Sequence, residues 1–145
     1  MRVHIEKVNS EEQEQVLIQC MVVNQEVKEI TDFIKSKDNT LTGYENSQRY
    51  HIALQDIYYF EGVDNKVYAY LHNHVYEIKN KLYELEESHK QQKFFRCSKS
   101  ILVNLLKIEY VKPALNGRFT ARLINGEQII ISRQYVPALK QVLQI

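Results

Sequence analysis

The sequence predicts a mainly β fold with short helices, of the α+β class. Apolar residues alternate with polar ones in short runs over most of residues 41–131, which is typical of half-buried strands. Polar clusters such as 62–66 separate these runs, and Asn125-Gly126 is a hairpin dipeptide. Helical spacing of apolar residues is confined to shorter segments. With 145 residues, the chain is long enough to bury one self-sustaining core.

The first 43 residues are predicted to form a strand, strand, helix segment. Val3 and Ile5 alternate with charged neighbours, and residues 16–23 are a second apolar run rich in branched side chains. A helix is expected next, with Asn24 as its N-cap. Its apolar positions recur at helical spacing: Val27, Ile30, Phe33 and Ile34. Because a segment of about 40 residues is marginal alone, we do not expect it to fold independently of the body, residues 44–145.

Antiparallel strands are predicted to make up the middle of the chain. The alternating pattern returns at Leu41 and is interrupted by polar turns near 62–66 and at Asn73. The expected strands are Arg49–Leu54, Asp56–Val63, Val67–His72 and Val75–Ile78. A short helix follows over Asn80–Ser88, with Leu82 and Leu85 spaced to face inward.

The last third is predicted to return to strands and to close with a helix. The expected strands are Phe94–Cys97, Tyr110–Leu115, Phe119–Ile124 and Gln128–Ile131, with a further apolar run at Ile101–Ile108. Asn125-Gly126 predicts a type I′ turn, in which both central residues have positive φ. The final helix is expected to start near Ser132 and to turn Val136, Leu139, Val142 and Leu143 inward. Since Pro137 fits only the first turn of a helix, either that turn is irregular or the helix starts one turn later.

Charge is strongly segregated along a chain whose formal net charge is only +1. Residues 90–145 hold ten Lys or Arg residues against two acids, Glu109 and Glu127, which gives a net charge of +8. Residues 1–43 and 44–89 carry net charges of −3 and −4. A concentrated field of one sign attracts a polyanion. Nucleic acid is therefore the first partner that the charge pattern indicates.

The sequence shows no recognisable catalytic, metal or cofactor site. His72 and His74 would project from one face of a strand, but no third metal ligand is evident, and a polar turn is the simpler interpretation. Cys97 lacks a local nucleophile signature, and the four glycines are not spaced to cradle phosphates. We therefore expect neither an enzyme nor a protein with a cofactor or a small-molecule substrate.

Cysteine content and hydropathy favour a cytoplasmic protein. Cys20 and Cys97 are too few for a disulfide framework or a zinc site. No stretch approaches the about 18 apolar residues that could span a bilayer, and the N-terminus lacks a signal-peptide pattern. Cys97 is expected to be a free core thiol; the alternative is a redox role, in which its oxidation loosens nucleic-acid binding.

Three short, donor-rich loops are predicted in the basic block. Residues 96–100 place two cations and two hydroxyls just after a strand, 116–118 form a polar basic turn, and 132–134 follow the predicted hairpin. Arginine can bond guanine with two hydrogen bonds, amides can bond adenine, and hydroxyls suit phosphate oxygens. Each loop alone would be an ordinary solvated turn, but three within a block of charge +8 favour nucleic-acid contact.

Three motifs resemble the LytTR DNA-binding domain of bacterial transcription regulators. They are DIYYFE at 56–61, FRCSKSILVN at 95–104, and GE at 126–127 followed by ISRQY at 131–135. Their order and spacing agree from about Tyr44 to the C-terminus. The resemblance implies an elongated fold of antiparallel strands that inserts loops, rather than a recognition helix, into successive major grooves. It identifies residues 44–145 as the DNA-binding domain.

The resemblance also implies which side chains meet DNA. Base contacts are implied for Asn65, Lys66, Lys99 and Arg133. Candidates for contacts to the DNA backbone are Arg96, Ser98, Ser100, Asn116, Arg118 and Gln134. Many relatives hold His or Asn where this chain has Lys66 and Lys99, and lysine there favours guanine or phosphate. Residues 101–103 are assigned to the core, and Asn104 to a turn.

The resemblance further implies a homodimer on direct repeats of double-stranded DNA, one helical turn, about 10 bp, apart. Residues 1–43 are too short for the receiver domain that precedes many such domains, so phosphorelay control is not expected. This segment could instead mediate dimerisation, cover the sheet, or receive a partner such as a small membrane protein that sequesters the regulator. Two alternatives stay open: a protein interaction module whose basic face docks an acidic partner, and an RNA-binding protein that stacks bases on tyrosines.

Overall fold

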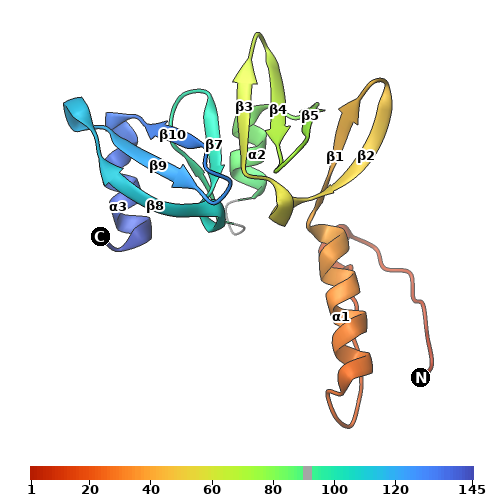
Figure 1. Cartoon of the computed structure of the whole chain (residues 1–145). Coiled ribbons are helices and arrows are strands. Elements are labelled where there is room, and N and C mark those ends of the chain that lie inside the picture. The colour runs from red at the N-terminus through yellow and green to blue at the C-terminus, as the bar shows by residue number, and fades with distance from the viewer. Residues whose placement is uncertain (90–92) are drawn as a thin grey trace. The chain divides into compact units, whose positions relative to one another are not determined.

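The structure divides into two compact units, Met1–Asp38 and Asn39–Ile145, which are described separately. The computed structural model describes residues 1–89 and 93–145, apart from the side chains of 36–38 (Figure 1). The predicted boundary after Gly43 falls inside the first strand, β1 (Thr40–Glu45). No helix in the described part of the chain has both the length and the apolar character required to cross a membrane.

The first unit contains one helix and no strand. Helix α1 spans Gln25–Asp38, and Asn24 caps it as predicted, because its Oδ1 accepts a hydrogen bond from the Val27 amide at 3.0 Å. The two predicted strands are wrong: residues 1–24 hold only a 3-10 turn at Glu11–Gln13. A strand needs a neighbour to satisfy its backbone groups, and neither apolar run has one in the described chain.

The first sheet has seven antiparallel strands in the order β2-β1-β5-β4-β3-β7-β6. Their bounds after β1 are Gln48–Ala53 (β2), Tyr59–Val63 (β3), Lys66–Tyr70 (β4), Val75–Ile78 (β5), Phe94–Arg96 (β6) and Ile101–Asn104 (β7). Strand β3 is shorter than predicted because Leu54–Asp56 forms a 3-10 turn. Two hairpins close through residue pairs with positive φ, Asn46-Ser47 and Asp64-Asn65, as type I′ turns require.

Helix α2 (Leu82–Ser88) covers part of this sheet. Leu82 and Leu85 are buried, as their spacing predicts, and they join a core that includes Phe60 and Leu102 from β3 and β7. Burying each such side chain contributes roughly 1.5–3 kcal/mol. This packing fixes α2 against the strands that flank the 98–100 loop.

The second sheet has three strands in the order β10-β9-β8, with bounds Ile108–Pro113 (β8), Phe119–Leu123 (β9) and Gln128–Ile131 (β10). Helix α3 (Val136–Leu143) follows a 3-10 turn at Arg133–Tyr135, which is the irregular start that Pro137 predicts. Val136 and Leu139 are buried as predicted. Val142 is 49% exposed, contrary to prediction, because it lies about 100° around the helix from Leu143.

The hairpin between β9 and β10 is confirmed, but its turn is not type I′. Of the predicted pair, only Gly126 has positive φ, at 94°. The Leu123 amide donates to the Glu127 carbonyl at 2.8 Å, which leaves a three-residue loop ending in a glycine bulge. Asn125 supports this loop with its side chain, because its Oδ1 accepts from the Glu127 amide at 3.0 Å.

A second core joins the two sheets and α3. It packs Tyr58, Cys97 and Val103 against four residues of the second sheet, Ala121, Leu123, Ile129 and Ile131, and against Val136 and Leu139 of α3. Asn104 is 1% exposed beside this core and donates from Nδ2 to the Ile57 carbonyl at 2.9 Å. Its Oδ1 accepts from the Leu106 amide at 3.0 Å, so the predicted role in a turn is confirmed. The loops that precede β7, β9 and α3 are thereby anchored to the same hydrophobic core.

Candidate nucleic-acid interface

Three loops meet at one surface hollow of about 660 Å³. Its lining comes from the loop between β6 and β7, the turn between β8 and β9, and the 3-10 turn after β10. The lining residues are Ser98, Lys99, Ser100, Asn116, Arg118, Ser132, Arg133 and Gln134. Seven of the ten residues predicted to contact DNA therefore share this hollow, although they are up to 36 positions apart in sequence.

The hollow presents hydrogen-bond donors and positive charge. Its lining comprises three cations, three hydroxyls and two amides, without a carboxylate. Lys99, Arg118 and Arg133 are exposed, so each cation can reach a bound partner. Phosphate oxygens and the acceptor edges of bases are the groups that such a surface can bond.

Backbone hydrogen bonds between the loops hold this hollow together. The Cys97 amide donates to the Ile101 carbonyl at 3.1 Å and closes the 97–101 loop. The Ser132 amide donates to the Cys97 carbonyl at 2.8 Å, which ties the end of β10 to that loop. Within the loop, the Ser100 amide donates to Ser98 Oγ at 3.3 Å. Lys99 and Arg133 are thus carried by backbone segments that are bonded to each other.

Gly117 lies directly beside Arg133. Asn116 and Gly117 have φ of 61° and 76°, a left-handed pair that a glycine accommodates most readily. A Cβ at position 117 would lie 3.0 Å from Arg133 Cδ and 3.2 Å from Cγ. The missing side chain therefore lets the stem of Arg133 lie against the 116–118 turn. Asn-Gly-Arg reads as an ordinary turn in the sequence, which carries no sign of this long-range contact.

Arg96 does not line the hollow but bonds the backbone of two residues that do. Its Nε donates to the Ser98 carbonyl at 2.7 Å, and Nη2 donates to the Lys99 carbonyl at 2.5 Å. Its Nη1 lies 3.3 Å from Glu86 Oε1 on α2. The guanidinium thus bonds the backbone of the 98–100 loop and a carboxylate, rather than projecting freely as a phosphate contact would.

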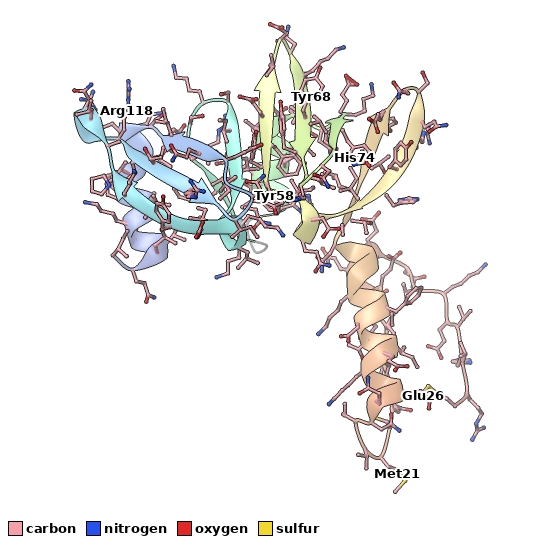
Figure 2. All side chains as sticks on the ribbon, viewed as in Figure 1. Met21, Glu26, Tyr58, Tyr68, His74 and Arg118 are labelled. Atoms are coloured by element: carbon pink, nitrogen blue, oxygen red, sulfur yellow. The ribbon has the colours of Figure 1, made fainter. Side chains whose placement is uncertain are left out.

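Asn65 and Lys66 lie elsewhere. Asn65 lies in the turn between β3 and β4, Lys66 is the first residue of β4, and neither lines the hollow. Lys66 Nζ lies 3.6 Å from Glu77 Oε1. In Figure 1 this turn is well separated from the turn between β8 and β9, where Figure 2 labels Arg118. One link runs toward the hollow, because the Gly62 amide of β3 donates to the Ser100 carbonyl at 2.8 Å.

Cys97 has the environment of a core thiol. It is fully buried, and burial raises the pKa of its thiol to about 12. Its Sγ lies 3.6 Å from the Ile101 carbonyl. Since the thiolate is the reactive form, this environment favours the core interpretation over the redox one. Cys20, in contrast, is exposed.

Several histidines and tyrosines pair with other aromatic rings. Among the described residues no group of three potential metal ligands occurs. His74 instead stacks on Tyr76 with ring centroids 5.6 Å apart. Tyr59 stacks on Tyr70 at 4.5 Å, a cross-strand pair of β3 and β4. Burial and a hydrogen bond with Glu127 raise the pKa of Tyr59, which keeps its hydroxyl protonated. These contacts favour packing over base stacking for Tyr59, Tyr70 and Tyr76.

A β scaffold that gathers three cations from separate loops on one surface has the chemistry of a nucleic-acid-binding domain. Comparison with known proteins gives the family. The LytTr DNA-binding domain matches residues 47–144, and the chain belongs to this family. A LytTr DNA-binding domain from Bacillus cereus has the same fold, with a TM-score of 0.70 and 23% identity, over 74% of this chain and 98% of that one.

Curated relatives match over nearly the whole chain. Two of them, from Staphylococcus aureus strains bovine RF122 / ET3-1 and MRSA252, are each 30% identical over 141 residues, which is 95% of this chain and 95% of theirs. Both are named uncharacterized HTH-type transcriptional regulators. In the described part of the present chain, the three α-helices are each separated by strands, so no two of them form a helix-turn-helix. The cations of the hollow lie on loops instead.

Proposed function

We propose that this protein is a cytoplasmic bacterial transcription regulator that reads specific double-stranded DNA sequences by inserting loops into successive major grooves. The observation that carries this proposal is the hollow, where three loops from separate strands place Lys99, Arg118 and Arg133 on one surface. Membership of the LytTr DNA-binding family and the names of the curated relatives support it. Phosphate contacts give affinity, and base-edge contacts give specificity.

Within the hollow, Lys99 and Arg133 are assigned to bases. Each can bond O6 and N7 of guanine in the major groove. Ser98, Ser100, Asn116, Arg118 and Gln134 are assigned to the DNA backbone, since hydroxyl, amide and cationic side chains around a base-reading pair suit phosphate oxygens.

Asn65 and Lys66 are assigned to a different groove from Arg133. Their turn does not line the hollow, and a contact there would lie apart from the Arg133 contact. Two base-contacting loops at separate places on the domain favour a DNA site that spans more than one major groove. A homodimer on direct repeats, one helical turn, about 10 bp, apart, would extend it further.

The first unit is proposed to support dimerisation. Nine large apolar side chains of residues 1–24 are between 47% and 102% exposed: Met1, Val3, Ile5, Val8, Val16, Leu17, Met21, Val22 and Val23. Met21 lies in the bend before α1 (Figure 2). Exposed apolar side chains in such number are typical of a segment that binds a partner, and a second copy of the chain is the partner expected at a direct repeat. Sedimentation should show self-association that increases with concentration.

Gel retardation with competitors tests the proposal. Labelled duplex DNA should be retarded at moderate salt and should be displaced by unlabelled duplex far better than by single-stranded RNA of the same sequence. Equal displacement by RNA would favour RNA binding. A protein partner retained after nuclease treatment, without DNA retardation, would favour a module that docks an acidic protein.

A further inference from the structure

We propose that Arg96 is a positioning residue for the Lys99 loop, anchored by Glu86 of α2, so that a carboxylate outside the hollow helps to set base preference. This inference rests on the proposed function. It concerns two residues that do not line the hollow, and it reassigns Arg96, which the sequence suggested as a contact to the DNA backbone.

The geometry around Arg96 carries the inference. Arg96 Nε and Nη2 lie on one edge of the guanidinium and donate to two neighbouring carbonyls, those of Ser98 at 2.7 Å and Lys99 at 2.5 Å. A planar fork that grips both carbonyls fixes the orientation of the peptide groups on either side of the Lys99 Cα. The direction in which the Lys99 side chain leaves the loop is thereby fixed as well.

Glu86 fixes the other side of the same guanidinium. Its Oε1 lies 3.3 Å from Arg96 Nη1, and the two side chains are 38% and 21% exposed. Leu82 and Leu85 bury the inner face of α2, so Glu86 is presented from a helix that is itself anchored in the core. Glu86 on α2 therefore contacts Arg96, and Arg96 in turn bonds the Ser98 and Lys99 carbonyls of the loop.

A phosphate contact and a positioning role predict different behaviour. If Arg96 bonded a phosphate, its loss would reduce the salt slope by about 0.9 and weaken every sequence alike. If Arg96 positions Lys99, disturbing its fork should relax preference at the bases that Lys99 reads. Arg96→Lys separates the two roles, because lysine keeps the charge but cannot bond two carbonyls as a planar fork.

The experiment uses the full chain and the duplex that it selects. Each base pair of that duplex is substituted in turn, and the affinities are measured for the wild type, Lys99→Ala, Arg96→Lys and Glu86→Gln. The positions at which Lys99→Ala loses discrimination define its subsite. We expect Arg96→Lys and Glu86→Gln to lose about fivefold or more in discrimination at those positions alone, comparable to the lower end of one base contact. The salt slope should stay within about 0.5 of the wild type, because neither Arg96→Lys nor Glu86→Gln removes a positive charge.

Glu84→Gln is the matched control. It removes the same charge from the same helix, and glutamine keeps the oxygen that accepts from the Lys81 amide at 3.0 Å. Its discrimination should equal that of the wild type. Circular dichroism and thermal melting of each variant check that the fold is retained.

The outcomes separate the inference from the proposed function. Wild-type protein that selects no duplex overturns both. A wild type that discriminates, together with Glu86→Gln and Arg96→Lys variants that discriminate equally well, overturns the positioning role alone. So does a uniform loss of affinity of the Arg96→Lys variant on all duplexes, because a contact to the DNA backbone carries no sequence information.

Discussion

At the scale of single residues, Arg133 offers the most direct test, because it is exposed and its stem lies against Gly117. Arg133→Ala should weaken binding to the selected duplex by about 1–3 kcal/mol and relax base preference at one position. Affinities for the selected duplex and its single-position variants measure this. Equal losses on every sequence would contradict a base contact and indicate a phosphate contact.

Gly117 should control Arg133 without touching DNA. Gly117→Ala places a Cβ 3.0 Å from Arg133 Cδ at a position with φ of 76°, so it should displace the guanidinium and destabilise the fold by about 1–2 kcal/mol. Discrimination should fall at the same base position as for Arg133→Ala, as measured on the same duplex set.

The matched control for this substitution is Gly62→Ala. A Cβ at Gly62 would meet only the Lys66 carbonyl, at an ordinary 3.8 Å, and its φ is not positive. It should keep full discrimination. A Gly117→Ala protein that discriminates as the wild type does would show that Arg133 does not depend on this close approach.

The two cysteines should differ sharply in reactivity. At pH 8 a thiol reagent should modify Cys20 rapidly and Cys97 only after unfolding, because Cys97 is buried with a pKa of about 12. The raised pKa also determines the direction in which stability changes with pH. Between the unfolded pKa, about 8.5, and about 12, only the unfolded state loses this proton, so stability falls as pH rises through that window. Rapid modification of both thiols in the native protein would contradict this account.

At the scale of elements, Asn104 connects β7 to the segment that leads into β3. Its side chain satisfies the Ile57 carbonyl and the Leu106 amide from a position that is 1% exposed. Asn104→Ala should lower the free energy of unfolding by about 1–3 kcal/mol, because buried polar groups lose their partners. Denaturant unfolding measures this. Asn80→Ala, at an exposed position before α2, should stay within about 0.5 kcal/mol of the wild type, and an equal effect of both changes would argue against the role of Asn104.

The elements also show which features the sequence could predict. Helix α1 with its Asn24 cap, the burial of Leu82 and Leu85, and the irregular start of α3 all depend on local spacing and were predicted correctly. The two N-terminal strands were wrong because alternation describes a strand only where a neighbour pairs with it. The turn at Asn125-Gly126 was wrong because the same dipeptide also suits a three-residue loop with a glycine bulge.

The site was predictable in its residue types but not in its connections. Polar, cationic loops in a basic block indicated the hollow, and seven predicted residues line it. Gly117 contacts Arg133, which is 16 positions away. Glu86 contacts Arg96, which is 10 positions away, and Arg96 bonds the carbonyl of Lys99, three positions further on. Such contacts leave no periodic signal in a single sequence.

At the scale of the whole molecule, net charge conceals the interface. The chain has a formal charge of +1, yet residues 90–145 carry +8 and supply all the cations of the hollow. Lys66 lies outside this block, in a stretch with a net charge of −4, and its ammonium lies near Glu77. To contact DNA, the Lys66 ammonium must therefore leave the Glu77 carboxylate and bond a base or a phosphate instead.

The central claim is that the hollow reads a specific duplex sequence, and selection from a random DNA pool by the purified protein tests it most directly. We expect an enriched motif that repeats in the same orientation at a spacing of about 10 bp. Selection by the Arg133→Ala variant should return the same motif with one position relaxed. A pool that shows no enriched motif at moderate salt, although the protein is folded, would contradict the claim.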